Sequence, residues 1–286
     1  MQQDALELVR LSRDRLSAQE GKVAAVVLER PEALLDATAG DLAILCEVSP
    51  ATVARFCQSV GFSGYREFRI AMAATVSRGQ AELERFELDT DEIDPADGIE
   101  DVIAKVRFHE VSAIEQTLRS LDRDSLERAV ASVVAARRIE IVGFGASGLT
   151  AQDLHQKLRR IGHSCAYSPD VHLALPSAAV LAPGDCVLAV SHSGRTGEVL
   201  SVLDVALEAG ATAIAVTNDP DSPLAHRADI VLTTRATERR FRSGAMASRS
   251  AQHAVLDVLF IRTAQETFGE SSELLRRTYE AVARRQ

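Results

Sequence analysis

A short apolar run at residues 186–190 ends in a loop of serines, glycine and threonine, and a helical pattern begins directly after the loop. The run has the length of a buried strand, and Val199, Val202 and Leu203 follow at helical spacing. Strand, tight polar loop and helix in this order form the unit from which a parallel sheet covered by helices is built. The first amides of the helix, which lack partners inside it, then lie beside hydroxyl groups, as in many anion sites.

The composition of this loop indicates which anion it suits. Its hydroxyls can donate hydrogen bonds, and its glycine lets the backbone approach a ligand closely. The loop has no lysine and does not match G-x-x-x-x-G-K-[ST], which argues against a nucleoside triphosphate. We therefore expect it to bind a single phosphate monoester on a small polar molecule, through Ser191, His192, Ser193, Gly194 and Thr196.

The same strand and helix alternation continues through the second half of the chain. Further strands are predicted at 139–142, 213–216 and 230–232, and helices at 100–119, 122–136, 148–161, 197–209, 245–268 and 271–284. Such alternation implies right-handed crossovers. The predicted fold class is therefore α/β, a doubly wound parallel sheet, preceded by an all-α N-terminal domain.

Length and composition narrow the class of protein. The chain has 286 residues, enough for two domains, a net charge of −9 and only 4% aromatic residues. That charge argues against coating nucleic acid or an anionic membrane with the whole surface, but leaves room for one local DNA-binding face. No signal peptide or membrane-spanning run is recognisable, so we expect a cytoplasmic protein. Its scattered cysteines are expected to be free thiols: Cys46, Cys57, Cys165 and Cys186.

A change of composition separates the two halves. Residues 1–80 show helical patterns only, whereas nine of the twenty residues at 81–100 are Asp or Glu. Pro95 and Gly98 interrupt that segment. We expect a helical domain at 1–80, an acidic solvated linker at 81–100 and a sheet domain at 101–286, with an acidic helix at 81–88 as the alternative for the start of the linker.

A second glycine loop, residues 143–148, follows the first predicted strand. It matches G-x-G-x-x-G, the dinucleotide-binding pattern, but position 163, where an acidic residue would hold the ribose, is His163. An NAD-dependent oxidoreductase therefore stays an alternative. So does the simpler interpretation that both loops are tight turns with Ser and Thr as helix caps.

The sequences GFGASG and SHSGRT together resemble the SIS (sugar isomerase) domain, a doubly wound fold that binds phosphosugars, over roughly residues 120–265. The resemblance implies that Gly145 and Ser147 of the first loop bind the phosphate together with the hydroxyls of the second loop. It implies no cofactor and no metal.

The N-terminal half contains a helix pair with a DNA-binding pattern. A short helix at 41–46 carries Leu42 and Leu45 on one face, and after a turn at 47–49 the next helix has an apolar stripe. Its opposite face has small and polar residues with one arginine, which suits a helix that enters the major groove. Any amphipathic helix pair shows similar polarity, so periodicity alone leaves both interpretations open.

The segment SPATVARFCQSVGFSGYREFRIAMA resembles the helix-turn-helix of RpiR/MurR-type transcriptional regulators, in which such a head precedes a SIS domain. The resemblance implies a regulator of carbohydrate metabolism, a dimer or tetramer, that binds operator DNA and senses a phosphorylated sugar. It implies DNA contacts at Ser49, Thr52, Arg55, Gln58, Ser59, Tyr65 and Arg66. One departure is Glu47, where a glycine is common in the turn; a side chain in a left-handed turn costs on the order of 1 kcal/mol.

An enzyme is the second hypothesis, because SIS domains also occur in phosphosugar isomerases, which need a carboxylate base and often a histidine. The sheet domain offers Glu198, Glu238, His172 and His253. The stretch FRSGAMASR, which in RpiR-type proteins starts a long helix, adds Ser248 and Arg249 as sugar contacts. Each has an ordinary structural role as its alternative, and the attached helix-turn-helix favours a sensor over a catalyst.

Overall fold

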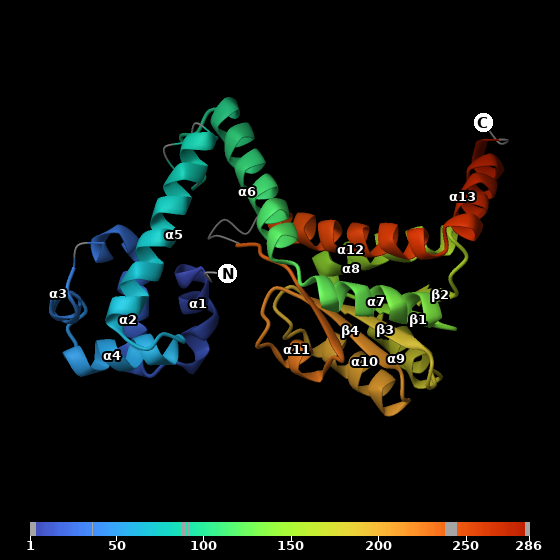
Figure 1. Cartoon of the computed structure of the whole chain (residues 1–286), viewed down its shortest axis with the longest axis horizontal. Coiled ribbons are helices and arrows are strands. Elements are labelled where there is room, and N and C mark those ends of the chain that lie inside the picture. The colour runs from blue at the N-terminus through green and yellow to red at the C-terminus, as the bar shows by residue number, and fades with distance from the viewer. Residues whose placement is uncertain are drawn as a thin grey trace. The chain divides into compact units, whose positions relative to one another are not determined.

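The computed structural model describes residues 4–283 except positions 36, 87, 89, 91 and 238–244. The chain divides into two compact units, residues 1–108 and 109–286, each with its own hydrophobic core (Figure 1). The division falls inside one helix, α6 (Ile99–Ser120). No helix of the described residues is long and apolar enough to cross a membrane.

The first unit is helical. Its helices are α1 (Ala5–Ser12), α2 (Ala18–Glu29), α3 (Ala39–Leu45), α4 (Pro50–Ser59) and α5 (Tyr65–Arg85), with 3-10 turns at Arg13–Arg15 and Pro31–Leu34. The core is centred on Phe56 of α4 and Phe68 of α5, whose rings meet edge to face with centroids 5.5 Å apart. Both rings are fully buried, so α4 is held firmly against α5.

The acidic segment 81–100 is only partly the expected linker. Helix α5 continues to Arg85, in agreement with the acidic-helix alternative over those residues, and α6 (Ile99–Ser120) begins within the segment. Just inside α6, Lys105 makes an ion pair of 2.7 Å with Asp97. Both ends of the expected linker are therefore helical.

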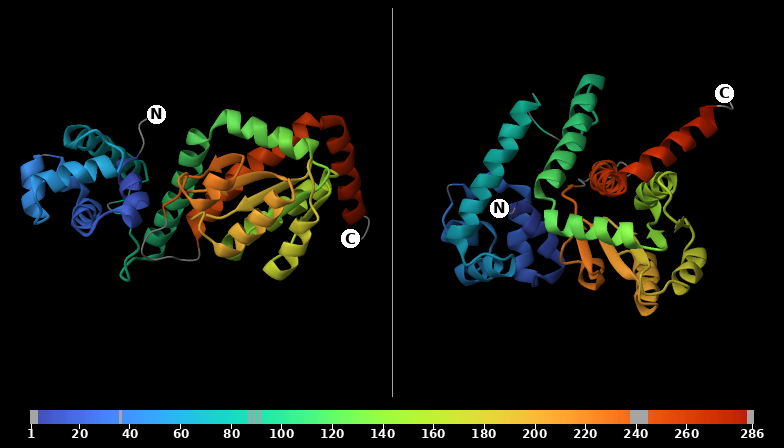
Figure 2. Two further views of the ribbon diagram at one scale, coloured as in Figure 1. Left: turned by 90° about the horizontal axis from the view of Figure 1, so that it is seen from below. Right: turned by 45° about the vertical axis from the view of Figure 1, so that its right-hand side comes forward.

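The second unit contains a sheet of five parallel strands in the order β2-β1-β3-β4-β5. The strands are β1 (Ile139–Val142), β2 (Cys165–Tyr167), β3 (Cys186–Val190), β4 (Thr212–Thr217) and β5 (Ile230–Thr233), and they can be followed in Figure 2. The doubly wound α/β fold is thus confirmed. Four strands match the predicted ones, whereas β2 and the helix after it were missed.

Helices cover both faces of this sheet. They are α7 (Arg123–Ala135), α8 (Gly145–Arg160), α9 (Val171–Ala179), α10 (Gly197–Glu208), α11 (Pro223–Arg227), α12 (Met246–Glu266) and α13 (Phe268–Ala283). Alternate residues of β3 face opposite ways: Leu188 packs in the core with α7, α8 and α12, and Val187 in the core with α9 and α10 (Figure 1). All four cysteines are free thiols, as predicted.

Candidate functional site

The strand order places a crevice at one end of the sheet. In the order β2-β1-β3-β4-β5 the direction of winding reverses between β1 and β3, and open α/β sheets bind ligands at the carboxyl ends of the two strands on either side of such a reversal. Val142 at the end of β1 is paired with Ala189 of β3. The loops 143–148 and 191–197, which follow these strands, therefore start side by side.

The second loop gathers its hydroxyls around a tight turn. Ser191 is buried, and its Oγ accepts a hydrogen bond of 3.2 Å from the amide of Gly194 and lies 3.0 Å from Thr196 Oγ1. Ser193 is exposed and its Oγ accepts from the amide of Arg195 at 3.2 Å. The oxygens of Ser191 and Ser193 accept from backbone amides, and one hydroxyl of the Ser191–Thr196 pair donates to the other, so the second proton of that pair and the Ser193 proton remain for a ligand.

Glycine is required in this loop. Gly194 has φ +63°, and a Cβ there would lie 2.1 Å from Ser222 Oγ and 2.8 Å from Thr217 Oγ1. The loop is also tied to the neighbouring strand, since the His192 carbonyl accepts hydrogen bonds from the Asn218 amide at 2.9 Å and from Thr217 Oγ1 at 3.3 Å. Its shape is therefore fixed from two sides.

The first loop is equally close-packed. Gly145 has φ +56°, and a Cβ on Gly143 would lie 2.8 Å from the carbonyl oxygen of Ser147. A Cβ on Gly148 would lie 2.9 Å from the hydroxyl of Tyr167, which ends β2. Ser147 Oγ accepts a hydrogen bond of 3.0 Å from the side-chain amide of Gln252. The glycines let α8 begin close to β1 and β2, with Ser147 in its first turn.

Both helices that follow these loops begin without a side-chain cap. Within the described residues, no side chain accepts a hydrogen bond from the first amides of α8 or α10, whereas Asp122, Asp170 and Ser222 cap α7, α9 and α11. Uncapped first-turn amides and the positive end of the helix dipole attract an anion. The cation of the second loop, Arg195, is bonded to Asp219 at 3.0 Å. The arrangement therefore offers mainly neutral donors, which suits a phosphate monoester.

In the first unit, α3 and α4 form the expected helix pair. Ser49 caps α4 by accepting from the Thr52 amide at 3.1 Å, and Val53, Phe56 and Cys57 are buried. The set of residues that α3 buries differs from the prediction. Leu42 is buried, but Leu45 is 46% exposed, because Cys46 takes the inward position instead.

On the opposite face of α4, fewer of the predicted side chains are available to contact DNA than expected. Arg55 and Gln58 are exposed, as the sequence pattern indicated. Thr52, however, is only 4% exposed, and its hydroxyl is 3.0 Å from Ser49 Oγ, so it cannot reach a base edge. Ser59 is exposed but donates to Glu20 Oε1 at 2.8 Å.

Two further predicted DNA contacts, Tyr65 and Arg66, lie at the start of α5. Tyr65 at the start of α5 is half-buried and donates its hydroxyl to the Ala37 carbonyl at 2.8 Å, which holds the chain before α3. Arg66 beside it is exposed. In the turn between α3 and α4, Glu47 has φ +53°, so a residue with a side chain does stand in a left-handed position of that turn.

Comparison with known proteins agrees with both units. The helix-turn-helix domain of the rpiR family matches residues 3–79, and the SIS domain matches residues 132–262. An HTH-type transcriptional regulator of Caldanaerobacter subterraneus subsp. tengcongensis is 35% identical over 99% of this chain and 98% of its own length.

The chain belongs to the RpiR family of transcriptional regulators.

Two other similarities bear on this RpiR-family protein. The structure of the Vibrio vulnificus NanR protein complexed with ManNAc-6P is 30% identical, with a TM-score of 0.62 over 99% of both chains. The bifunctional protein glk of Burkholderia orbicola is 35% identical over 97% of this chain, which spans only 42% of that protein.

Of the remaining candidates, only Glu198 lies next to one of the two loops. Ser248 is buried and its Oγ donates to the Ala245 carbonyl at 3.2 Å; Arg249 Nε donates to the same oxygen at 3.2 Å, so both serve the start of α12. Glu198 is exposed in the first turn of α10. His172 is exposed at the start of α9, and Glu238 lies outside the described residues.

His253 has a neighbour of its own. It is partly exposed on α12, with Nδ1 3.6 Å from Asp153 Oδ2 on α8. Asp153 also makes an ion pair of 2.6 Å with Lys157, and Lys157 is bonded to Asp257. These contacts place His253 in a partly exposed ion-pair cluster between α8 and α12, outside the hydrophobic core.

Sequence reasoning missed the residues that support Ser147. Gln252 and Thr150 are buried polar residues, at 1% and 0% exposure, and they are hydrogen-bonded to each other. A signal was present for Gln252, because it is a polar residue within the apolar stripe of α12 that includes Ala251 and Val255. Tyr167 was missed together with β2.

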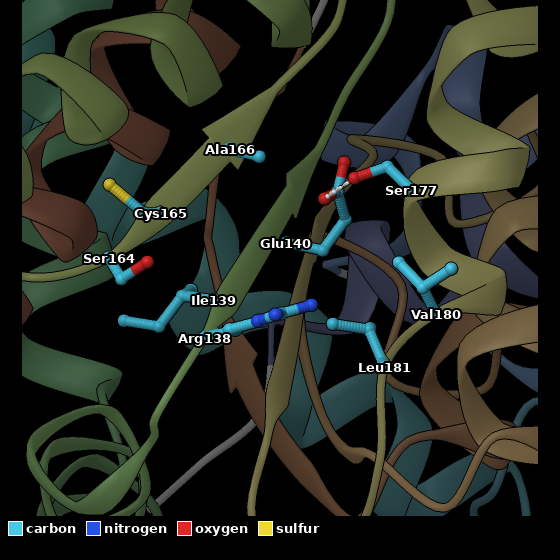
Figure 3. A pocket seen from close by; sticks show the side chains of 9 residues that line it. All are labelled: Arg138, Ile139, Glu140, Ser164, Cys165, Ala166, Ser177, Val180 and Leu181. Carbon is cyan, nitrogen blue, oxygen red and sulfur yellow. Dashed lines mark hydrogen bonds between the residues drawn. The ribbon is translucent and has the colours of Figure 1, made fainter.

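A separate cavity of about 190 Å³ lies at the opposite end of the strands (Figure 3). It is lined by the first residues of β1 and β2 and by the end of α9. Glu140 is only 2% exposed there; Ser177 donates to its Oε2 at 2.5 Å, and Oε1 has no hydrogen-bond partner among the described residues. Burial raises the pKa of the Glu140 carboxyl above its usual value.

Proposed function

We propose that this protein is a cytoplasmic, DNA-binding regulator of carbohydrate metabolism whose SIS domain senses a phosphorylated sugar between loops 143–148 and 191–197. We further propose that residues 1–80 are its DNA-binding domain and 101–286 its sensing domain. The observation that carries the proposal is the pair of uncapped helices, α8 and α10, which begin in neighbouring loops at the point where the sheet reverses.

The phosphate would be bound by backbone amides and hydroxyls. Ser191, Ser193 and Thr196 supply donors from the second loop, and Ser147 supplies one from the first. The NanR protein complexed with ManNAc-6P supports a phosphosugar as the ligand class. Glu198, at the start of α10, would lie close enough to the phosphate loop to contact a sugar hydroxyl.

DNA would be read chiefly by two side chains of α4. Arg55 suits guanine and Gln58 suits adenine in the major groove, each through paired hydrogen bonds. Ser49 and Arg66, both exposed near the ends of the same region, would contact phosphates. One such face is small, so we propose that the protein binds as a dimer or tetramer on two half-sites.

We propose that the SIS domain senses its sugar and does not convert it. A catalyst of aldose–ketose isomerisation needs a base and usually a histidine at the sugar. His172 is exposed on α9 and His253 is engaged with Asp153, whereas His192 belongs to the second loop, where we assign it to binding the phosphate. The sugar would act by shifting the population between two arrangements of the oligomer that space the DNA-binding domains differently.

A mobility-shift titration tests both halves of the proposal. The full chain is titrated on the DNA upstream of its own gene at physiological salt with excess competitor DNA, alone and with a panel of sugar phosphates that includes ManNAc-6P. We expect specific binding that one sugar phosphate alters. Arg55→Ala should abolish specific binding, and the double substitution of Ser191 and Ser193 by Ala should abolish only the response to the sugar.

Two results would contradict the proposal. Unchanged specific binding by Arg55→Ala would remove α4 as the recognition helix. Turnover of a sugar phosphate that is lost in Glu198→Gln would show an enzyme, with the helix-turn-helix as an accessory domain. Arg277→Ala, at an exposed position of α13, is the control for loss of positive charge alone.

A further inference from the structure

Gln252 is a buried amide on α12 that contacts the first phosphate loop from behind. It is 1% exposed, so both polar atoms of its side chain need partners. Nε2 donates to Ser147 Oγ at 3.0 Å, and Oε1 accepts from Thr150 Oγ1 at 3.2 Å. The amide therefore connects α12 to two residues of the first turns of α8.

The direction of these hydrogen bonds decides what Ser147 can do. A serine hydroxyl has one proton to donate and lone pairs that accept. Because Gln252 Nε2 donates to Ser147 Oγ, the proton of Ser147 is not used by Gln252. A phosphate dianion only accepts hydrogen bonds, so Ser147 is useful to it only in this state.

Thr150 favours this orientation of the amide. Its hydroxyl lies 2.9 Å from the Ser147 carbonyl and 3.2 Å from Gln252 Oε1, and it is fully buried. If the amide were turned by half a revolution, Oε1 would face Ser147 and take its proton. Thr150 has one proton, which is shared between the Ser147 carbonyl and Gln252 Oε1, and this shared donation to Oε1 opposes that turn.

We infer that Gln252, held by Thr150, is a positioning residue that fixes Ser147 as a hydrogen-bond donor toward the phosphate of the ligand. This inference rests on the proposed function and extends it to residues that do not touch the ligand. It also gives a basis for preferring an oxyanion over a neutral group, because a ligand hydroxyl can either donate or accept, whereas a phosphate oxygen needs the donor.

The test compares six variants of the full chain, the sixth being Ser147→Ala, by calorimetric titration with inorganic phosphate and with ManNAc-6P. Gln252→Glu replaces the donor with an acceptor and adds charge, and we expect affinity to fall about 100-fold at pH 8. Gln252→Met removes both bonds and should lower affinity about tenfold. Thr150→Val should lower it severalfold, and Thr150→Ser, which keeps the hydroxyl, should restore it. Gln265→Glu, an exposed position on the same helix, is the matched control and should bind normally.

A dependence on pH separates positioning from a structural role. Protonation turns the carboxyl of Gln252→Glu back into a donor, so its affinity for sulfate, which stays a dianion, should recover relative to the unmodified chain between pH 8 and pH 5. A merely structural role would give no recovery and would make Gln252→Met at least as harmful as Gln252→Glu.

The outcomes are distinguishable from failure of the proposed function. If Gln252→Glu and Thr150→Val bind phosphate like the unmodified chain while Ser147→Ala does not, Gln252 has no positioning role and the inference is wrong. If Ser147→Ala also binds normally, the phosphate site itself is misplaced. Should Gln252→Glu fail to fold, the comparison of Thr150→Val with Thr150→Ser decides the matter alone.

Discussion

Replacing Gly194 by alanine should damage the second loop in two ways. The residue has φ +63°, which costs an L-residue with a side chain roughly 1–2 kcal/mol. The added Cβ would also lie 2.1 Å from Ser222 Oγ and 2.4 Å from Ser222 Cβ. Ser222 is fully buried and caps α11 through the Ala225 amide, so it cannot move away without losing that bond.

These contributions set the expected size of the effect. Overpacking at a filled site costs roughly 1–3 kcal/mol, and a lost helix cap about 1 kcal/mol. Since relaxation of the loop would relieve part of the overlap, we expect Gly194→Ala to lower the free energy of unfolding of the second unit by roughly 2–5 kcal/mol. For a unit of this size the transition temperature should then fall by roughly 5–15 °C.

Differential scanning calorimetry can follow the transition of the second unit separately from that of the first. Gly197→Ala is the matched control, because it lies three residues on, at the start of α10, and a Cβ there meets nothing within 4 Å. It should leave the transition within about 1 °C. A Gly194→Ala transition that also stayed within that range would refute the close approach of the loop to Ser222.

Three other predictions concern different parts of the molecule. Glu47→Gly should stabilise the first unit by roughly 0.5–1 kcal/mol in urea unfolding, because φ +53° suits glycine; a loss of stability would contradict this. Burial raises the pKa of Glu140, so the folded state binds the proton of this carboxyl more tightly than the unfolded state does. The stability that this proton contributes is present below the unfolded pKa and is lost as the pH rises through the folded pKa. Glu140→Gln should therefore be more stable than the unmodified chain by roughly 1–3 kcal/mol at pH 8, with a gap that closes toward pH 4 in urea titrations; a gap independent of pH would exclude this cause. DNA binding measured by fluorescence anisotropy should weaken roughly a thousandfold between 50 and 200 mM salt if about six phosphates are contacted, whereas phosphate binding by neutral donors should change little.

The sequence allowed the main strands to be predicted because they are fully buried. The run that forms β3 is apolar on both faces, which is typical of a central parallel strand, and the loop after it has an unmistakable composition. Strand β2 has only three residues and is half-exposed at the edge of the sheet, so it has no apolar run to detect. The helix after it was missed as well, because Pro176 inside α9 reads as an interruption.

Side-chain roles were harder to predict than elements. Thr52 is a plausible groove contact by residue type, but it lies four residues before Phe56 on the same side of α4 and is buried with it. Its hydroxyl is satisfied by Ser49, a local bond that composition does not reveal. Gln252 is more than 100 residues from Ser147, and only the packing of α12 on α8 brings them together.

A site built from neutral donors depends on geometry more than on charge. A phosphate can use a loop hydroxyl only if no other acceptor holds its proton, and three of the hydroxyl oxygens accept from protein groups: Ser191 from Gly194, Ser193 from Arg195 and Ser147 from Gln252. Two of these partners are amides of the loop itself, while the third comes from α12. The first loop is therefore the one whose donor depends on the packing of another helix, α12, against α8.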